Sequence, residues 1–327
     1  MLRTLLWSPF LSLLVPLLAM LSMPGLALAQ AYPAKPVRIV ISFPPGGSTD
    51  FLGRLLAERM SMGMQQSVVV DNRPGGNSVI AAEAVAKSAP DGYTLFMAVD
   101  ATMSLNPIIY AKLPYAPEKD FAPISNVASQ SLFIVAGPRS PVRTMPELIA
   151  YARANPGKLS YGTSAQLQML VGEKLKMDSK VNMLHVPFKG SPGMVQAVLG
   201  GEIDFCITAV MPYATYVKEG KLFGLATSGA RREQMLPNTP TVRELGLGDL
   251  ELGNWSALFA PAGTPAPILD RLNAEVRRAM GDATVAERLG AAGIYPSPGT
   301  PAELRALIAA DQERWSKIIK AANIKLE

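Results

Sequence analysis

A strand followed directly by a glycine-rich turn and a helix start is the feature that most constrains this chain. The β-branched, apolar run Val37–Ser42 predicts a buried strand, and the sequence FPPGGSTD of Phe43–Asp50 follows it. The two glycines turn the chain, and Ser48 or Thr49 is available to cap a helix that Phe51 begins. The unpaired amides and positive dipole end of such a helix start can bind a carboxylate or phosphate without a basic side chain. No Gly-Lys-Ser/Thr follows, so a nucleotide P-loop is not indicated.

Short apolar strands and amphipathic helices alternate along the rest of the chain, which predicts an α/β fold. We expect strands at Val37–Phe43, Ser67–Asp71, Tyr93–Val99, Leu132–Ala136, Leu159–Thr163, Asn182–Val186, Ile203–Ala209 and Asn254–Ala260. We expect helices at Thr49–Met60, Val79–Ser88 and Ser164–Lys176, and after Thr144, Pro192 and Thr300. Thr144-Met145-Pro146-Glu147 and Thr300-Pro301-Ala302-Glu303 both have the spacing of a capping box. A proline-rich passage separates Pro107 from the strand expected at Leu132.

The N-terminal segment has the organisation of a secretory signal peptide. Arg3 is the only charged residue before Lys35, an apolar stretch runs from Leu11 to Leu21, and small residues place cleavage after Ala29 or Ala31. A permanent membrane anchor is disfavoured because prolines interrupt a segment that is short for a spanning helix. We therefore predict that residues 1–31 are a cleaved signal peptide and that the mature protein is exported and soluble.

The composition argues against several classes of function. The formal net charge is +5, but the basic residues are scattered, so no nucleic-acid-binding stripe is indicated. Cys206 is the only cysteine and His185 the only histidine, which excludes an intramolecular disulfide and any multi-histidine metal site. The apolar neighbours of Cys206 predict a buried strand thiol. We expect neither a cofactor nor a metal.

Eight motifs together resemble the receptors of the tripartite tricarboxylate transporter family, often called Bug-type extracytoplasmic solute receptors. They span nearly the whole chain after the signal peptide in the family's order, namely Tyr32–Val40, Phe43–Asp50, Val70–Gly76, Pro90–Leu95, Ala154–Leu159, His185–Gly190, Leu199–Asp204 and Leu258–Pro265. The resemblance implies a type II periplasmic binding protein, in which two α/β lobes joined by two crossing strands close on a ligand. We expect residues 32–130 plus 253–327 to form lobe 1 and residues 131–252 to form lobe 2.

The resemblance also implies small organic carboxylates as ligands, bound mostly by backbone amides, hydroxyls and bridging waters. Carried over by motif, the ligand-binding residues are Phe43, Gly46, Gly47, Ser48, Thr49 and Asp50 in the first loop, Val99, Asp100, Ala101 and Thr102 in the second, Thr163, Ser164, Ala165 and Gln166 in the third, and Thr208. The resemblance further implies a monomer that works with membrane transporter subunits. A receptor that presents its ligand-bound form to a periplasmic sensor is the alternative, since both roles use a closed two-lobe state.

Three positions depart from the family pattern and bear on the ligand. The loop after Thr163 is shorter than in most relatives, and Thr208 stands where many have aspartate. Asp100 stands where relatives often have a small hydroxyl or amide residue, and a carboxylate there would repel a ligand carboxylate. Either Asp100 turns to the backbone, or the ligand brings a positive or donor group. This favours a smaller, nitrogen-bearing carboxylate, such as an amino acid.

An enzyme is the less favoured interpretation. A hydrolase would combine Ser48 or Ser164 with His185 and Asp100 or Asp204, but His185 lies in a strand-like run and no Gly-x-Ser-x-Gly elbow accompanies it. We therefore expect no catalysis. For Trp255, lining the cleft and packing in the core between the lobes remain equally open.

Overall fold

The computed structural model describes residues 32–229, 231–250 and 252–321. The predicted signal peptide, residues 1–31, lies outside the described residues. None of the described helices is both long and apolar enough to cross a membrane.

The described strands form a ten-stranded hydrogen-bonded system in the order β2-β1-β3-β9-β4-β7-β5-β6, with β8 and β10 each paired to β4. The strands are β1 (Val37–Ile41), β2 (Val68–Asn72), β3 (Thr94–Val99), β4 (Phe121–Ala136), β5 (Ser160–Thr163), β6 (Leu184–Pro187), β7 (Phe205–Ala209), β8 (Phe223–Thr227), β9 (Gly253–Pro261) and β10 (Ile294–Pro296). β1 pairs in parallel with β2 and β3, and β5 pairs in parallel with β6 and β7. Two parallel α/β sets are thus joined through the antiparallel strands β9 and β4.

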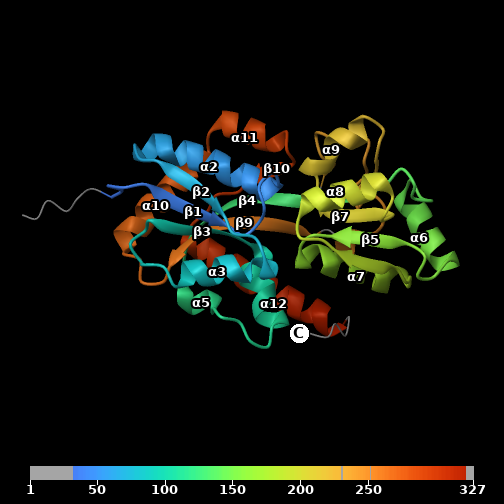
Figure 1. Cartoon of the computed structure of the whole chain (residues 1–327), viewed down its shortest axis with the longest axis horizontal. Coiled ribbons are helices and arrows are strands. Elements are labelled where there is room, and N and C mark those ends of the chain that lie inside the picture. The colour runs from blue at the N-terminus through green and yellow to red at the C-terminus, as the bar shows by residue number, and fades with distance from the viewer. Residues whose placement is uncertain (1–31, 230, 251, 322–327) are drawn as a thin grey trace, which may run out of the picture. The chain divides into compact units, whose positions relative to one another are not determined.

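β4 belongs to both sheets and changes partners along its length (Figure 1). Its first part, Phe121–Ser131, pairs with β9, whereas Leu132–Ala136 pairs with β7 and Phe133–Ala136 with β8. The change between Ser131 and Leu132 fits a crossing strand. The lobe boundaries expected from the sequence remain a prediction.

The helices cover both faces of each sheet (Figure 1). They are α2 (Ser48–Met64), α3 (Val79–Ala86), α4 (Asn106–Ile109), α5 (Pro117–Asp120), α6 (Met145–Ala154), α7 (Gln166–Ser179), α8 (Ser191–Gly200), α9 (Met211–Lys218), α10 (Ala266–Met280), α11 (Ala283–Gly290) and α12 (Pro301–Ala321), with short turns η1 (Gly76–Ser78), η2 (Ala101–Leu105) and η3 (Gly248–Leu250). On the first sheet, Val40, Phe96 and Ala98 pack with α3. On its other face, α2 comes so close that a Cβ on Gly53 would lie 2.3 Å from the Ile41 side chain.

Side chains alternate across β7 as a buried strand requires. Phe205 and Ile207 pack in the core that contains α7, and Cys206 packs in the core that contains α8. Figure 1 shows these two helices on opposite sides of the strand. The prediction of a buried strand thiol is confirmed, and burial raises the pKa of Cys206 to about 12.

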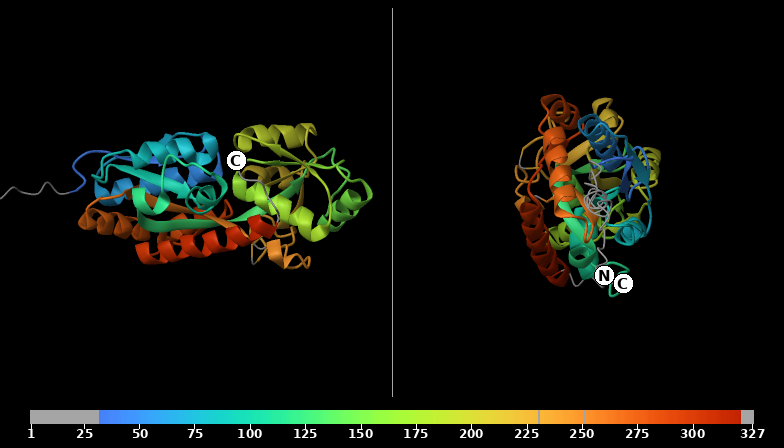
Figure 2. Two further views of the ribbon diagram at one scale, coloured as in Figure 1. Left: turned by 90° about the horizontal axis from the view of Figure 1, so that it is seen from below. Right: turned by 90° about the vertical axis from the view of Figure 1, so that its left-hand side faces the viewer.

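α12 contributes to both cores. Leu304 near its start packs with the first sheet, whereas Trp315 and Ile319 near its end pack in the core that contains α7. The left view of Figure 2 shows α12, in red, running along the strands. A helix of 21 residues is about 30 Å long, enough to reach from one core to the other.

Both predicted capping boxes are present, with one difference. Thr300 and Glu303 cap each other reciprocally, while Thr144 accepts from the Glu147 amide and Glu147 reaches the amide of Arg143 instead of that of Thr144. The proposed cap of α2 is wrong. The N-cap of α2 is Gly47, which has no side chain to cap the helix. The helix begins at Ser48, so Ser48 and Thr49 are its first two residues and neither occupies the N-cap position.

The extent of β4 differs from the prediction. The strand begins at Phe121 instead of Leu132, within the passage that its prolines made resemble a loop. Pro123 is tolerated because the β4–β9 register shifts between Pro123 and Ser125, and proline fits such an irregularity. The short elements α9, β8 and β10 were also not predicted.

Ser228 joins β4 to the segment that enters β9. Its hydroxyl accepts from the amide of Leu132 at 2.8 Å and donates to the carbonyl of Leu252, and its own amide donates to the carbonyl of Leu132. Ser228 is 5% exposed, so water does not replace these bonds freely.

We expect Ser228→Ala to lower the free energy of unfolding by about 1–3 kcal/mol, because the buried Leu132 amide and Leu252 carbonyl lose a partner. Urea unfolding followed by circular dichroism measures this change. Ser88→Ala is the control, since the hydroxyl of Ser88 donates to the carbonyl of Ala84 at the partly exposed end of α3. An equal loss in both variants would contradict the role of Ser228.

Candidate ligand-binding site

The loops that follow strands of both α/β sets line an inner cavity of about 40 Å³. Its walls come from the ends of β1, β3, β5, β6 and β7 and the start of β9, and the lining residues are Phe43, Pro44, Gly47, Ser48, Thr49, Val99, Asp100, Ala101, Ser164, Ala165, Leu167, Gln168, Gly190, Ser191, Pro192, Ala209 and Asn254. Ligands of open α/β sheets bind at such carboxyl-terminal strand ends.

Three helices begin at the inner cavity. The N-cap residues are Gly47 for α2, Ala165 for α7 and Gly190 for α8, and no side chain caps any of them. The first-turn amides of these helices have no intrahelical partner, and each helix start carries a positive partial charge of roughly +0.5. The cavity therefore gathers donors and positive potential from the backbone.

Side chains add no positive charge to the inner cavity. Among its described lining residues none is lysine or arginine, and Asp100 is the one ionisable side chain. A cavity of this kind can bind an anion through amides and hydroxyls.

An outer pocket of about 590 Å³ adjoins the inner cavity and shares six lining residues with it: Phe43, Pro44, Val99, Ala101, Ser164 and Ala165. Pro187 and Phe188 extend its apolar wall, and Lys189 brings a positive charge to it. Its size suits the body of a small ligand. The two spaces together offer a polar inner end and a mixed outer end.

The turn η1 forms one wall of the outer pocket. Gly75, Gly76, Asn77 and Ser78 all have positive φ, which gives this loop a left-handed path. The Asn77 side chain donates to the hydroxyl of Tyr110 at 2.6 Å, and the Gln166 side chain donates to the same hydroxyl at 3.2 Å. Tyr110 thus connects loops from both α/β sets.

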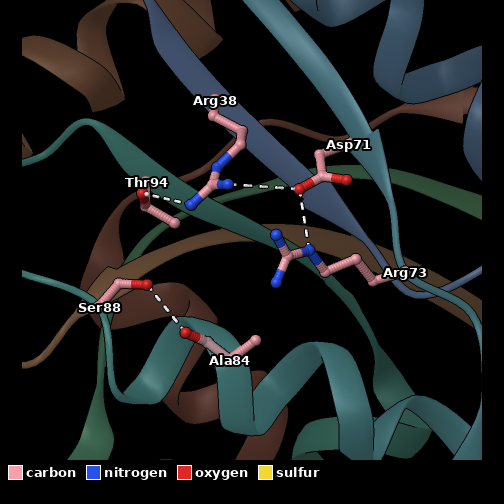
Figure 3. Close-up of polar contacts among 6 residues, drawn as sticks. All are labelled: Arg38, Asp71, Arg73, Ala84, Ser88 and Thr94. Atoms are coloured by element: carbon pink, nitrogen blue, oxygen red, sulfur yellow. Dashed lines mark hydrogen bonds and ion pairs between the residues drawn. The ribbon is translucent and has the colours of Figure 1, made fainter.

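Charged side chains on β1 and β2 hold the strand that leads into this loop (Figure 3). Asp71 accepts from Arg73 at 2.9 Å and from Arg38 at 3.5 Å, and Arg38 also donates to Thr94. These groups are partly exposed, so the pairs contribute little to stability and serve to orient the loop.

Asp50 has a structural role in the first loop. Its carboxylate accepts from the amide of Gly46, from Arg54 and from Asn72. Burial raises its pKa, but these hydrogen bonds outweigh burial and hold the pKa below its usual value. Gly46, with φ of +89°, supplies the left-handed turn that brings its amide to Asp50.

The predicted site residues divide into two groups. Those brought to the two pockets are Phe43, Gly47, Ser48, Thr49, Val99, Asp100, Ala101, Ser164, Ala165 and Gln166. Those that do not line them are Gly46, Asp50, Thr102, Thr163 and Thr208. Ligand contact by any of these residues remains a prediction.

Several lining residues were missed from the sequence. The start of α8 at Gly190, Ser191 and Pro192 carries a helix-start signal that sequence analysis recognised without assigning it to the site. Gln168 and Asn254 carry no local signal. Asn254 reaches the cavity only because β9 pairs with β3 and β4.

Three residues considered for function have structural partners. Asp204 accepts from the amide and hydroxyl of Ser160, which makes it a strand-end residue. Trp255 is buried in the core of the first sheet and donates to Asp311 at 2.6 Å, so it does not line the inner cavity. His185 bonds Thr163 through Nε2 at 2.7 Å, and its ring lies 5.1 Å from that of Tyr161 at a tilt of 37°.

We expect His185 to make stability depend on pH. Burial lowers its pKa below 6.5, with Glu173 opposing and Lys176 assisting the shift, so the folded state binds fewer protons than the unfolded state. This contribution is complete above 6.5 and is lost as the pH falls below it. Urea unfolding at about pH 7.5 and about pH 5.5 should show a smaller loss for His185→Gln than for the unsubstituted protein. Equal losses would contradict this.

Comparisons with known proteins agree with the fold described above. Residues 52–324 match the tripartite tricarboxylate transporter family receptor. BugT of Bordetella pertussis is 33% identical over 304 residues, which cover 91% of this chain and 93% of BugT. An R. palustris protein solved with adipate superposes with a TM-score of 0.86 at 33% identity, covering 90% of this chain and 99% of that one.

MatC from Rhodopseudomonas palustris with bound malate superposes with a TM-score of 0.82 at 29% identity, covering 88% of this chain and 100% of MatC. The resemblance seen in the sequence and the expected α/β periplasmic binding protein fold are confirmed. Proteins of this family are solute receptors, which also confirms the expectation that the chain is not an enzyme. The chain belongs to the tripartite tricarboxylate transporter receptor family.

Proposed function

We propose that this protein is a periplasmic receptor that captures a small organic carboxylate by closing its two lobes and delivers it to a tripartite tricarboxylate-type membrane transporter. The observation that carries the proposal is the meeting of three uncapped helix starts, those of α2, α7 and α8, at one cavity without a basic lining side chain. Interaction with one helix start contributes about 0.3–1 kcal/mol, and up to about 2 kcal/mol in a partly buried site. Three together supply much of the binding energy of a small anion.

The relatives support the carboxylate as the ligand class. One family relative was solved with adipate and another with malate, both dicarboxylates. The polar inner cavity suits one carboxylate, and the outer pocket with Lys189 at its wall has room for the remainder of such a ligand.

Residues of the site come from both α/β sets, which supports capture by closure. Ser48 and Asp100 belong to the first set, and Ser164 and Ser191 belong to the second. The sets are joined at the partner change of β4 and at Ser228, where a change of backbone angles alters the distance between the helix starts.

Delivery to a transporter rests on the family to which the chain belongs. Deleting the gene should abolish uptake of the ligand, and the full chain should restore it. If the protein binds the ligand but uptake persists in cells that lack the gene, the sensor alternative is favoured.

N-terminal sequencing of the exported protein tests cleavage after Ala29 or Ala31.

A thermal-shift screen of mono-, di- and tricarboxylates tests ligand class. A ligand at a hundred times its Kd should stabilise the folded state by about 2.7 kcal/mol, which a thermal shift detects readily. If no carboxylate raises the melting temperature, the proposal fails.

Gly47→Val should abolish this ligand-induced shift and leave the stability of the ligand-free protein nearly unchanged. Gly47 has φ of −88°, which any residue adopts, and a Cβ there would have only the Pro44 carbonyl within 4 Å, at 3.9 Å. The branched side chain obstructs access to the α2 amides. Gly248→Val is the matched control because a Cβ there meets nothing within 4 Å and Gly248 does not line the cavity. Wild-type binding by Gly47→Val would contradict the site.

Small-angle X-ray scattering should show a smaller radius of gyration when a ligand identified by the screen is added. The same data give the molecular mass, for which we expect a monomer. Identical scattering with and without a saturating ligand would count against closure.

A further inference from the structure

Two side-chain oxygens at the inner cavity have no hydrogen-bond partner among the described residues. They are Oδ2 of Asp100 and Oδ1 of Asn254, and both atoms are buried. Asp100 is 2% exposed as a residue. Buried polar atoms are nearly always paired in folded proteins, so two unpaired acceptors at one cavity indicate that a donor is supplied from outside the chain.

The strand register brings these two residues to the same end of one ladder. β3 and β9 are antiparallel, with Val99 opposite Ser256. Asp100 directly follows Val99, and Asn254 lies two residues before Ser256. Both residues therefore lie just beyond the same end of the β3–β9 pairing, beside the start of η2, and both line the inner cavity.

We propose that the ligand is an α-amino acid, with its ammonium group bound by the side-chain oxygens of Asp100 and Asn254 and its carboxylate at the starts of α2, α7 and α8. This inference rests on the proposed receptor function and narrows its ligand class. Acceptors and anion-binding amides lie around one small space, and an α-amino acid presents the two complementary groups on neighbouring atoms.

The volumes fit this division of the ligand. One water molecule needs roughly 10–15 Å³ of such space, so the inner cavity of about 40 Å³ has room for a carboxylate and an ammonium group. The side chain of the amino acid extends into the outer pocket of about 590 Å³.

The charges favour a cation beside Asp100. Asp311 on α12 acts on Asp100 and adds negative potential, and its ion-pair partner Arg314 is partly exposed. β9 contributes the uncharged Asn254, and the lining residues of the inner cavity other than Asp100 are uncharged. A ligand that brought only a carboxylate would leave the Asp100 acceptor unpaired or repel its charged form.

Protonation gives a second signature. Burial raises the pKa of Asp100 well above its usual value, Asp311 raises it further, and the amide of Ala101 opposes the shift. An ammonium beside the carboxylate favours its charged form, so binding of an amino acid releases a proton and strengthens as the pH rises. A protonated Asp100 that donated to a ligand carboxylate would give the opposite dependence.

Three matched series test the proposal by isothermal titration calorimetry on the mature protein. Each series changes only the group on C2 from ammonium to hydroxyl to hydrogen: alanine, lactate and propionate; aspartate, malate and succinate; leucine, 2-hydroxy-4-methylpentanoate and 4-methylpentanoate. In the series whose side chain fits, we expect the amino acid to bind about ten- to hundredfold more tightly than the acid with hydrogen, as for a hydrogen bond to a charged group.

Asp100→Asn should remove most of this preference by weakening the binding of the amino acid, and it should not weaken the binding of the acid with hydrogen, because it removes a carboxyl that repels a ligand carboxylate. Asp91→Asn is the control, because it makes the same change at an exposed carboxyl that pairs with Lys35 and does not line the cavity, and it should retain the preference. Titrations in buffers of different ionisation enthalpy should show proton release on amino-acid binding, and Asp100→Asn should abolish that release.

The outcomes separate the two proposals. Equal or tighter binding of the deaminated acids, or proton uptake on binding, overturns the amino-acid inference and leaves the carboxylate receptor standing. An unchanged preference in Asp100→Asn overturns the assignment of the ammonium to Asp100. If no member of any series and no other carboxylate binds, the receptor function itself is wrong, and the inference falls with it.

Discussion

The hydrogen-bond ladder of β4 is the constraint on which the rest of this protein depends. One strand gives its first part to β9 and its last five residues to β7, so neither sheet is complete without it. Because backbone pairing fixes register, each α/β set is held at a set position along the same strand. The loops that form the cavity therefore meet through strand geometry, and Ser228 ties the second chain crossing to the first at the point where the partners change.

The binding site that results is made mostly of backbone. Helix starts supply donors whose direction is fixed by the helix itself, so little side-chain entropy is lost when an anion binds. The side chains at the site can then set its selectivity, that is, distinguish one anion from another. Asp100 and Lys189 are the charged side chains that line the two pockets and are available for that task, since Asp50 is already occupied with Gly46, Arg54 and Asn72.

Sequence analysis predicted what local chemistry determines. The β1–α2 turn, the two capping boxes and the buried thiol each depend on a few neighbouring residues. It was wrong or incomplete where the structure depends on residues that are distant in the sequence. Pro123 resembles a loop residue until β9 pairs beside it, and the start of α8 becomes part of the site only when both sets meet. Asn254 is separated from Asp100 by most of the second α/β set, so no local pattern could have joined them.

The single cysteine gives this protein a natural probe of local opening. Cys206 is fully buried between β7 and α8, and its thiol is neutral at ordinary pH. A sulfhydryl reagent reacts with the thiolate, so it can modify Cys206 only after the strand and helix separate. The modification rate of the unaltered chain thus reports how often the second α/β set opens. A ligand that bridges both sets would slow that rate without any engineered label.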